Sequence, residues 1–183
     1  MEELFSHVLD DDEKIIKVFK PNKAKLFLSS IVLNFMWSFW FLIFGIIAIL
    51  VPEEGVSINK IFVLIPIGLY IVIFAFLMLF TSLHYKNVYY AYSNKRIIIR
   101  SGIFGVDYKS LDMSMIGAID VYVSLLDKIA KKNTGSLTFG SAASPVGDSK
   151  ASGYRFNHVV MPYETCKEIK SYIDDYKKSM NSK

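Results

Sequence analysis

The sequence predicts an α+β protein: a two-helix transmembrane hairpin followed by an antiparallel β-barrel or sandwich that a C-terminal α-helix caps. Three observations support this class. Two long apolar runs, 26–51 and 61–83, contain no charged residue, a series of short strand signals follows them, and the chain ends in an amphipathic helical pattern. We therefore divide the 183 residues into a cytoplasmic N-terminal segment (1–25), the hairpin (26–83) and a soluble domain (84–183).

Each apolar run is long enough to cross a bilayer. At ~1.5 Å per helical residue, both exceed the roughly 30 Å hydrocarbon core. A helix in a soluble core has no reason to be apolar on every face over such a length. The first run starts after 25 residues and lacks a small-x-small cleavage pattern, so we do not expect a cleaved signal peptide.

The charges beside the two runs predict their orientation. The loop 52–60 contains a single cation, Lys60, whereas lysines and arginines are frequent before the first run and after the second. The positive-inside rule therefore places the protein in the cell membrane with both termini in the cytoplasm. These flanking cations are Lys14, Lys17, Lys20, Lys23, Lys25, Lys86, Lys95, Arg96 and Arg100.

Small and polar residues form one stripe along the first run. Ser30, Asn34 and Ser38 recur every four residues, and Gly45 follows seven residues later. Such a stripe is typical of a helix–helix contact in lipid, where close packing and hydrogen bonds hold helices together. We expect it to pack against the second span, and a contact within a homo-oligomer is the alternative. A transport pathway is disfavoured because the spans contain no charge.

Short strand signals alternate with turns beyond the hairpin. In Lys95–Arg100, Arg96 and Arg100 share one face while Ile97 and Ile99 share the other. We expect further strands at 87–93, 103–112, 116–123, 136–140 and 154–160, a mobile loop at 141–153, and a helix from Pro162 to about Met180. Residues 13–20 fit either a short strand or a helical turn lying along the membrane.

Several of these motifs occur together in a known family. Residues 90–104 read Tyr-Ala-Tyr-Ser-Asn-Lys-Arg-Ile-Ile-Ile-Arg-Ser-Gly-Ile-Phe, and a strand from Ile116, Leu125-Leu-Asp-Lys128, Gly135 and the C-terminal helix follow. This pattern resembles the bacterial pleckstrin-homology-like (PH-like) domain family, and the two preceding spans resemble its YdbS-like membrane proteins. The resemblance covers nearly the whole chain. It implies a PH-like barrel or sandwich with a capping helix, and it implies no catalytic activity.

The charge of the soluble domain suggests an anionic membrane surface as its partner. Residues 84–183 contain 15 Lys and Arg against 9 Asp and Glu, a net +6. Cations close to an anionic leaflet each contribute about 1 kcal/mol of attraction. The alternative is a solvated basic surface that only obeys the positive-inside rule. Our candidate lipid-facing cations are Lys86, Lys95, Arg96, Arg100 and Lys109, with Lys131 and Lys132 as a second patch.

The resemblance points to part of the same surface. Eukaryotic relatives often bind phosphoinositides through basic residues of the first strand pair. Lys95, Arg96 and Arg100 lie in a comparable hairpin of this sequence. Because the family is bacterial and bacteria generally lack phosphoinositides, the resemblance implies no phosphoinositide ligand for these three residues.

The sequence gives no sign of an enzyme. His7, His84 and His158 lack metal-ligand spacing, Cys166 is the single cysteine, and the common nucleotide-binding and hydrolase motifs are absent. We expect no catalytic residue, metal or cofactor, and no nucleic-acid partner. The expected function is a membrane-anchored adaptor for anionic lipid or a protein. The alternative is a structural or regulatory subunit of a membrane complex, bound through the stripe or through a groove between a strand edge and the C-terminal helix.

Overall fold

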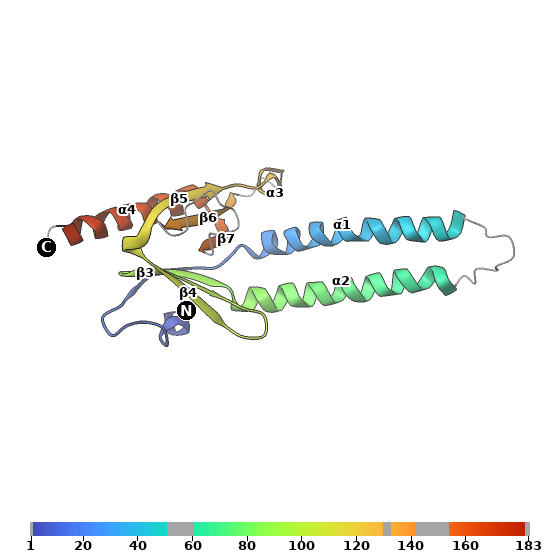
Figure 1. Cartoon of the computed structure of the whole chain (residues 1–183), viewed down its shortest axis with the longest axis horizontal. Coiled ribbons are helices and arrows are strands. Elements are labelled where there is room, and N and C mark those ends of the chain that lie inside the picture. Colours follow the sequence, from blue (N-terminus) through green and yellow to red (C-terminus); the bar gives the residue numbers. More distant parts are fainter. Residues whose placement is uncertain (1, 51–60, 130–132, 142–153, 182–183) are drawn as a thin grey trace. The chain divides into compact units, whose positions relative to one another are not determined.

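The computed structural model describes residues 2–50, 61–129, 133–141 and 154–181 (Figure 1). It consists of two compact units. One combines Met1–Lys25 with His84–Lys183, and the other is Leu26–Leu83. We call them the domain and the hairpin.

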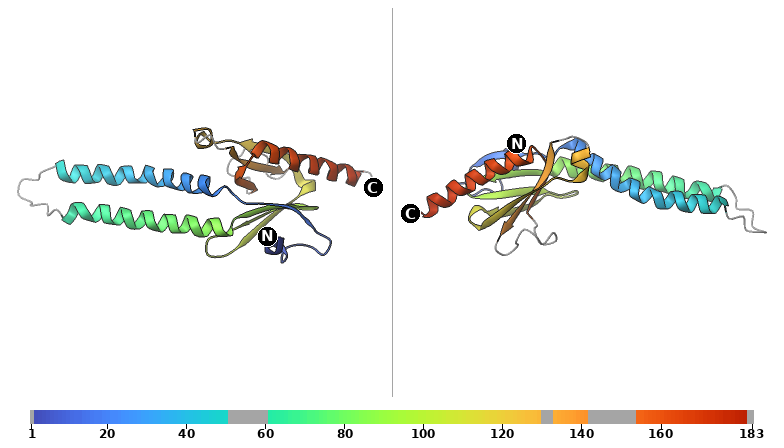
Figure 2. Two further views of the ribbon diagram at one scale, coloured as in Figure 1. Left: turned by 180° about the vertical axis from the view of Figure 1, so that it is seen from behind. Right: turned by 90° about the horizontal axis from the view of Figure 1, so that it is seen from above.

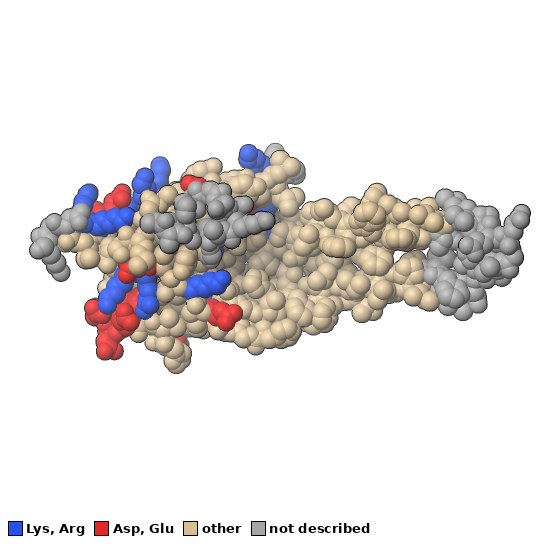
Figure 3. All heavy atoms as spheres, viewed as in Figure 1, with Lys and Arg blue, Asp and Glu red and all other residues tan. Residues whose placement is uncertain are grey.

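Most of α1 (Lys23–Leu50) and of α2 (Ile61–Asn87) forms the hairpin, while the first residues of α1 and the last residues of α2 belong to the domain. Two segments of these helices, Lys23–Ile47 and Ile65–Asn87, are long and apolar enough to cross a membrane. Few of their side chains are buried: Phe35, for example, is 72% exposed. The described part of the hairpin has an uncharged surface (Figure 3). Such a surface requires an apolar medium or partner, because water solvates it poorly.

The domain contains a four-stranded antiparallel sheet in the order β1-β2-β3-β4. Its strands are β1 (Ile15–Phe19), β2 (Tyr89–Ser93), β3 (Arg96–Ser101) and β4 (Asp107–Asp112). The first strand, β1, precedes the hairpin and pairs with β2, so that Val18 lies opposite Ala91. The hairpin is therefore inserted in the chain between two paired strands.

A three-stranded antiparallel sheet and the last helix complete the domain. Its strands are β5 (Ile116–Tyr122), β6 (Thr134–Ser141) and β7 (Arg155–Val160), in the order β5-β6-β7. The short helix η2 (Met113–Met115) joins the sheets, α3 (Leu125–Ile129) follows β5, and α4 (Pro162–Asn181) follows β7 (Figure 2). The expected loop 141–153 lies outside the described residues, apart from Ser141 at the end of β6.

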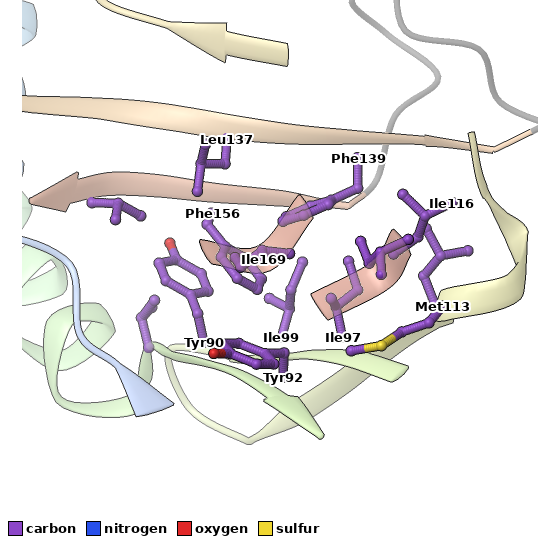
Figure 4. Packing of buried hydrophobic residues seen from close by; sticks show 14 residues of the cluster. Tyr90, Tyr92, Ile97, Ile99, Met113, Ile116, Leu137, Phe139, Phe156 and Ile169 are labelled. Carbon is purple, nitrogen blue, oxygen red and sulfur yellow. The ribbon is translucent and has the colours of Figure 1, made fainter. Parts of the chain in front are cut away.

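The alternation of side chains along β2 and β3 creates two apolar clusters. Tyr90, Tyr92, Ile97 and Ile99 face the main core, where they meet side chains of the second sheet and of α4 (Figure 4). Ala91 and Ile98 belong to the second cluster, which lies on the opposite face of the sheet and is covered by Phe5. The short helix η1 (Glu2–Phe5) supplies this phenylalanine, which is fully buried.

The N-terminal residues therefore differ from our expectation. We expected residues 1–25 to be a segment separate from residues 84–183, with 13–20 as a strand or a turn along the membrane. The structure places residues 1–25 in one unit with 84–183 instead, but it confirms the strand alternative for 13–20, because Ile15–Phe19 is a strand of the sheet. The physical reason is that the edge of β2 offers backbone hydrogen bonds and that Ala91 and Ile98 need a cover.

Truncation of Phe5 tests whether the N-terminal residues are part of the folded domain. We expect Phe5→Ala to lower the free energy of unfolding by about 3 kcal/mol, because it removes a buried aromatic ring. Thermal or chemical unfolding of the full chain in lipid nanodiscs measures the effect, with the exposed neighbour His7→Ala as control. Equal stability of both variants would contradict the described packing.

Candidate functional site

Two of the expected lipid-facing cations, Lys95 and Arg96, are paired with acidic N-terminal residues. Lys95 Nζ lies 2.5 Å from Asp12 Oδ1, and Arg96 Nη2 lies 2.6 Å from Glu13 Oε2. The carbonyl oxygen of Val8 accepts a further hydrogen bond from Arg96 Nη2 at 2.8 Å. These contacts hold the N-terminal segment on the β2–β3 turn and neutralise the charge there.

The ion pair between Arg96 and Glu13 is the better shielded of the two. The Glu13 side chain is fully buried, and it also accepts a 2.5 Å hydrogen bond from Ser93 Oγ. Burial opposes ionisation of Glu13, but the hydrogen bonds from Arg96 and Ser93 prevail and keep its pKa below the usual value of 4.5. The Lys95–Asp12 pair is more exposed, so water and salt screen it.

Arg100 belongs to a different group of side chains, which we call the basic–aromatic cluster: Lys20, Lys23, Tyr85, Tyr89 and Arg100. Lys20 Nζ donates to Tyr89 Oη at 2.9 Å and lies 4.5 Å from the centre of the Tyr85 ring. The Lys23 amine lies 6.0 Å from the same ring, and the Arg100 guanidinium lies 5.5 Å from the Tyr89 ring. Aromatic faces attract and stabilise nearby cations.

This cluster gathers residues that border the two helices of the hairpin. Lys23 is the first residue of α1, and Lys20 precedes that helix by three residues. Tyr85 lies in the last turn of α2, and Tyr89 is the first residue of β2. The pairing of β1 with β2, in which Phe19 lies opposite Tyr90, brings them together. We noted Lys20 and Lys23 only as flanking cations, because a pairing across 70 residues leaves no local signal in the sequence.

The remaining candidate cations are Lys86, Lys109, Lys131 and Lys132. Lys86 and Lys109 are exposed and have no ion-pair partner among the described residues. Lys131 and Lys132 lie outside the described residues. Of the five described cations that we selected, Lys95 and Arg96 pair with acidic residues at the β2–β3 turn, Arg100 belongs to the cluster, and Lys86 and Lys109 are exposed.

Lys25, a flanking cation in the sequence, forms a buried ion pair. Its Nζ atom lies 2.8 Å from Asp127 Oδ1, and the two side chains are 2% and 4% exposed. At the start of α3, the Asp127 carboxylate accepts a hydrogen bond from Ser124 N–H, and the Ser124 hydroxyl oxygen accepts one from Asp127 N–H. The Thr134 hydroxyl also donates to the Asp127 carboxylate. Burial opposes ionisation of Asp127, but the bonds from Lys25, Ser124 and Thr134 keep its pKa below its usual value.

His158 lies close enough to this pair to feel its charges. Burial and the positive charge of Lys25 lower the pKa of His158, so the imidazole is neutral at neutral pH. Its backbone has a φ of 56° at a bulge in β7, and its carbonyl oxygen accepts a 2.7 Å hydrogen bond from Asn22 N–H. These contacts give His158 a structural role.

Within the described ranges, the structure contains no group of three or more His, Cys, Asp or Glu side chains that could hold a metal ion. Burial raises the pKa of the Cys166 thiol, which keeps it protonated and therefore weakly nucleophilic.

In the hairpin, the Ser30–Gly45 stripe is only partly in contact with α2. Ser30 Oγ accepts a 3.0 Å hydrogen bond from Thr81 on α2, and Asn34 and Ser38 are buried. The Ser38 hydroxyl donates to the Phe35 carbonyl of its own helix. Gly45 has open space where a Cβ would be.

Comparison with protein families agrees with this architecture. The family model described as Bacterial PH domain matches residues 26–177. The chain belongs to the bacterial PH domain family. Searches among curated proteins and among solved structures each gave no match. PH domains are generally binding modules rather than enzymes, so membership favours a binding function.

The position of the basic residues within this bacterial PH domain corrects one expectation. We placed Lys95, Arg96 and Arg100 in the first strand pair, but they belong to the second, β2–β3, because β1 precedes the hairpin. The lysines near the first strand pair are Lys14, Lys17, Lys20 and Lys23. Of these, Lys20 and Lys23 are members of the basic–aromatic cluster.

Removal of the Asp127 charge tests the buried ion pair. We expect Asp127→Asn to lower the free energy of unfolding at pH 7 by about 3–5 kcal/mol, because Lys25 is left buried and unpaired. A Lys25→Met/Asp127→Leu double variant should regain part of this loss, because neither charge remains. Chemical unfolding of the full chain in detergent measures all three proteins.

The same pair predicts an acid-dependent loss of stability. Folding lowers the Asp127 pKa below its ordinary value of 3.8. The ionised carboxylate therefore makes its full contribution to the free energy of unfolding above pH 3.8, and this contribution is lost as the pH falls through the lower folded pKa. The stability difference between the wild type and Asp127→Asn should therefore shrink below about pH 4. A constant difference down to pH 2 would contradict this pairing.

Proposed function

We propose that the protein is a membrane-anchored, non-enzymatic binding module whose bacterial PH domain recognises anionic lipid headgroups at the cytoplasmic face. The two apolar helices supply the anchor. The observation that carries the proposal is the basic–aromatic cluster at the chain positions that border both helices. Membrane interfaces favour such a combination, since tyrosine rings prefer the headgroup region and cations attract anionic lipids.

The charge distribution supports the same surface. Together, residues 1–25 and 84–183 contain 20 Lys and Arg against 15 Asp and Glu, a net +5. Asp10, Asp12 and Glu13 lie at the β2–β3 turn, where they pair with Lys95 and Arg96. These three acidic residues therefore lie at the other end of β3 from Arg100, whereas the cations of the cluster contact aromatic rings and neutral polar groups. The cluster is thus the better candidate for attracting an anionic headgroup.

Lipid selectivity of the full chain tests the proposal. In liposomes of neutral lipid with a small fraction of spin-labelled lipid, we expect labelled phosphatidylglycerol to be immobilised more strongly than labelled phosphatidylcholine. A Lys20→Gln/Lys23→Gln/Arg100→Gln variant should weaken this preference by up to about five-fold for each removed charge, and high salt should weaken it in the wild type.

The matched control is Lys167→Gln/Lys170→Gln/Lys178→Gln, which removes the same charge from exposed positions on α4. It should retain the preference of the wild type. An equal loss in both triple variants would mean that only net charge matters, and equal binding of both lipids by the wild type would refute headgroup recognition.

A protein partner is the second candidate, and one observation favours it. The edge strand β5 and α4 border a groove of about 290 Å³, lined by Ile116–Ile119 and by Lys170, Ile173, Asp174 and Lys177. An extended segment could add to the β5 edge there. Native mass spectrometry from lipid nanodiscs would support this role if it found a stable complex whose size did not depend on the anionic lipid or on the cluster.

A further inference from the structure

The β3–β4 loop exposes an apolar tip. Within Gly102–Val106, Phe104 is 84% exposed, and Ile103 and Val106 are 38% and 39% exposed. Phe104 is the most exposed large hydrophobic side chain among the described residues. Water solvates such a side chain poorly, so its exposure calls for an explanation.

Two backbone segments of the loop approach each other closely at Gly102. Gly102 has a φ of 150°, and a Cβ at this position would collide with the carbonyl oxygen of Gly105. Only glycine fits this close approach of the two backbone segments. The conformation of the loop therefore depends on glycine at position 102.

Contacts within the domain hold the loop beside the last residue of α2. Asn87 Nδ2 lies 3.4 Å from the Ile103 carbonyl oxygen, and Arg100 Nη1 donates to the Asn87 carbonyl at 3.0 Å. Asn87 is also the last residue of the second candidate span. The apolar tip thus lies where the chain leaves that span.

A second apolar tip lies beside the start of α1. Leu125 of α3 is 71% exposed, and its neighbour Ser124 accepts a 3.1 Å hydrogen bond from Lys25 Nζ in the first turn of α1. The views of the domain place α3 and the β3–β4 loop at the same end of this unit (Figures 1 and 2). Each of the two points where the chain passes into a candidate span therefore has an exposed apolar side chain next to it.

From this arrangement we infer that the β3–β4 loop and α3 insert Phe104 and Leu125 into the interfacial region of the bilayer that the spans cross. This inference rests on the proposed membrane anchoring. A bilayer explains both tips at once, because a lipid surface meets the chain at each entry point. The cations of the basic–aromatic cluster lie nearby, where they can meet headgroups while the apolar tips reach below them.

Site-directed spin labelling of the full chain in liposomes tests the inference. In a Cys166→Ser background, nitroxides are attached to Phe104→Cys or to Leu125→Cys, both at exposed positions. The matched control is Met115→Cys, since Met115 is 62% exposed and follows the other end of β4. Phe39→Cys, at a position 61% exposed in α1, serves as the bilayer reference.

Collision rates with oxygen and with a water-soluble nickel complex report the depth of each label. We expect the labels at 104 and 125 to be reached several-fold more by oxygen relative to nickel than the label at 115. Equal, water-like ratios at 104, 115 and 125 would overturn the inference. A label at 104 shielded from both reagents would also overturn it, because that result indicates a protein cover.

The reference at position 39 separates the inference from the proposed function. A water-like ratio at 39 would refute the membrane anchor itself, and the inference would fail with it. A bilayer-like ratio at 39 together with water-like ratios at 104 and 125 would refute only the insertion of the two tips.

Discussion

The pairing of β1 with β2 is the constraint on which the rest of the domain depends. The two strands flank the apolar hairpin in the chain, yet Val18 and Ala91 are register partners. Their pairing completes the four-stranded sheet and brings Lys20 next to Tyr85 and Tyr89. Without it, β2 would have an open edge, and the basic–aromatic cluster would have no scaffold.

The acidic start of the chain divides the basic residues into two groups. Glu13 and Asp12 neutralise Arg96 and Lys95 and fasten the N-terminal segment to the outer face of the sheet, where Phe5 is buried. The cations of the cluster lie against aromatic rings, which attract them. Ion pairs thus serve the fold at one end of β3, and the basic–aromatic cluster, where we propose lipid binding, lies at the other.

Much of the fold could be predicted because its signals are local. The two apolar runs, the alternation of Ile97 and Ile99 with Arg96 and Arg100, and the apolar stripe of α4 depend on neighbours a few residues apart. The family match confirmed the resemblance that these signals suggested.

The sites depend on contacts between residues far apart in the sequence, which local patterns do not contain. The sequence shows Lys25 only as a flanking cation and Arg96 as a candidate lipid-facing cation. The structure adds that they pair with Asp127 and Glu13. The isolated fragment 84–183 would lack β1 and Phe5, so binding studies require the full chain.

The most direct test of this account is whether the hairpin interrupts a strand pair of the bacterial PH domain. Nuclear magnetic resonance of the full chain in lipid nanodiscs would detect backbone contacts between Ile15–Phe19 and Tyr89–Ser93. The account predicts cross-strand contacts, such as those between Val18 and Ala91, together with extended chemical shifts for β1. Helical shifts for residues 15–19, without contacts to β2, would contradict it.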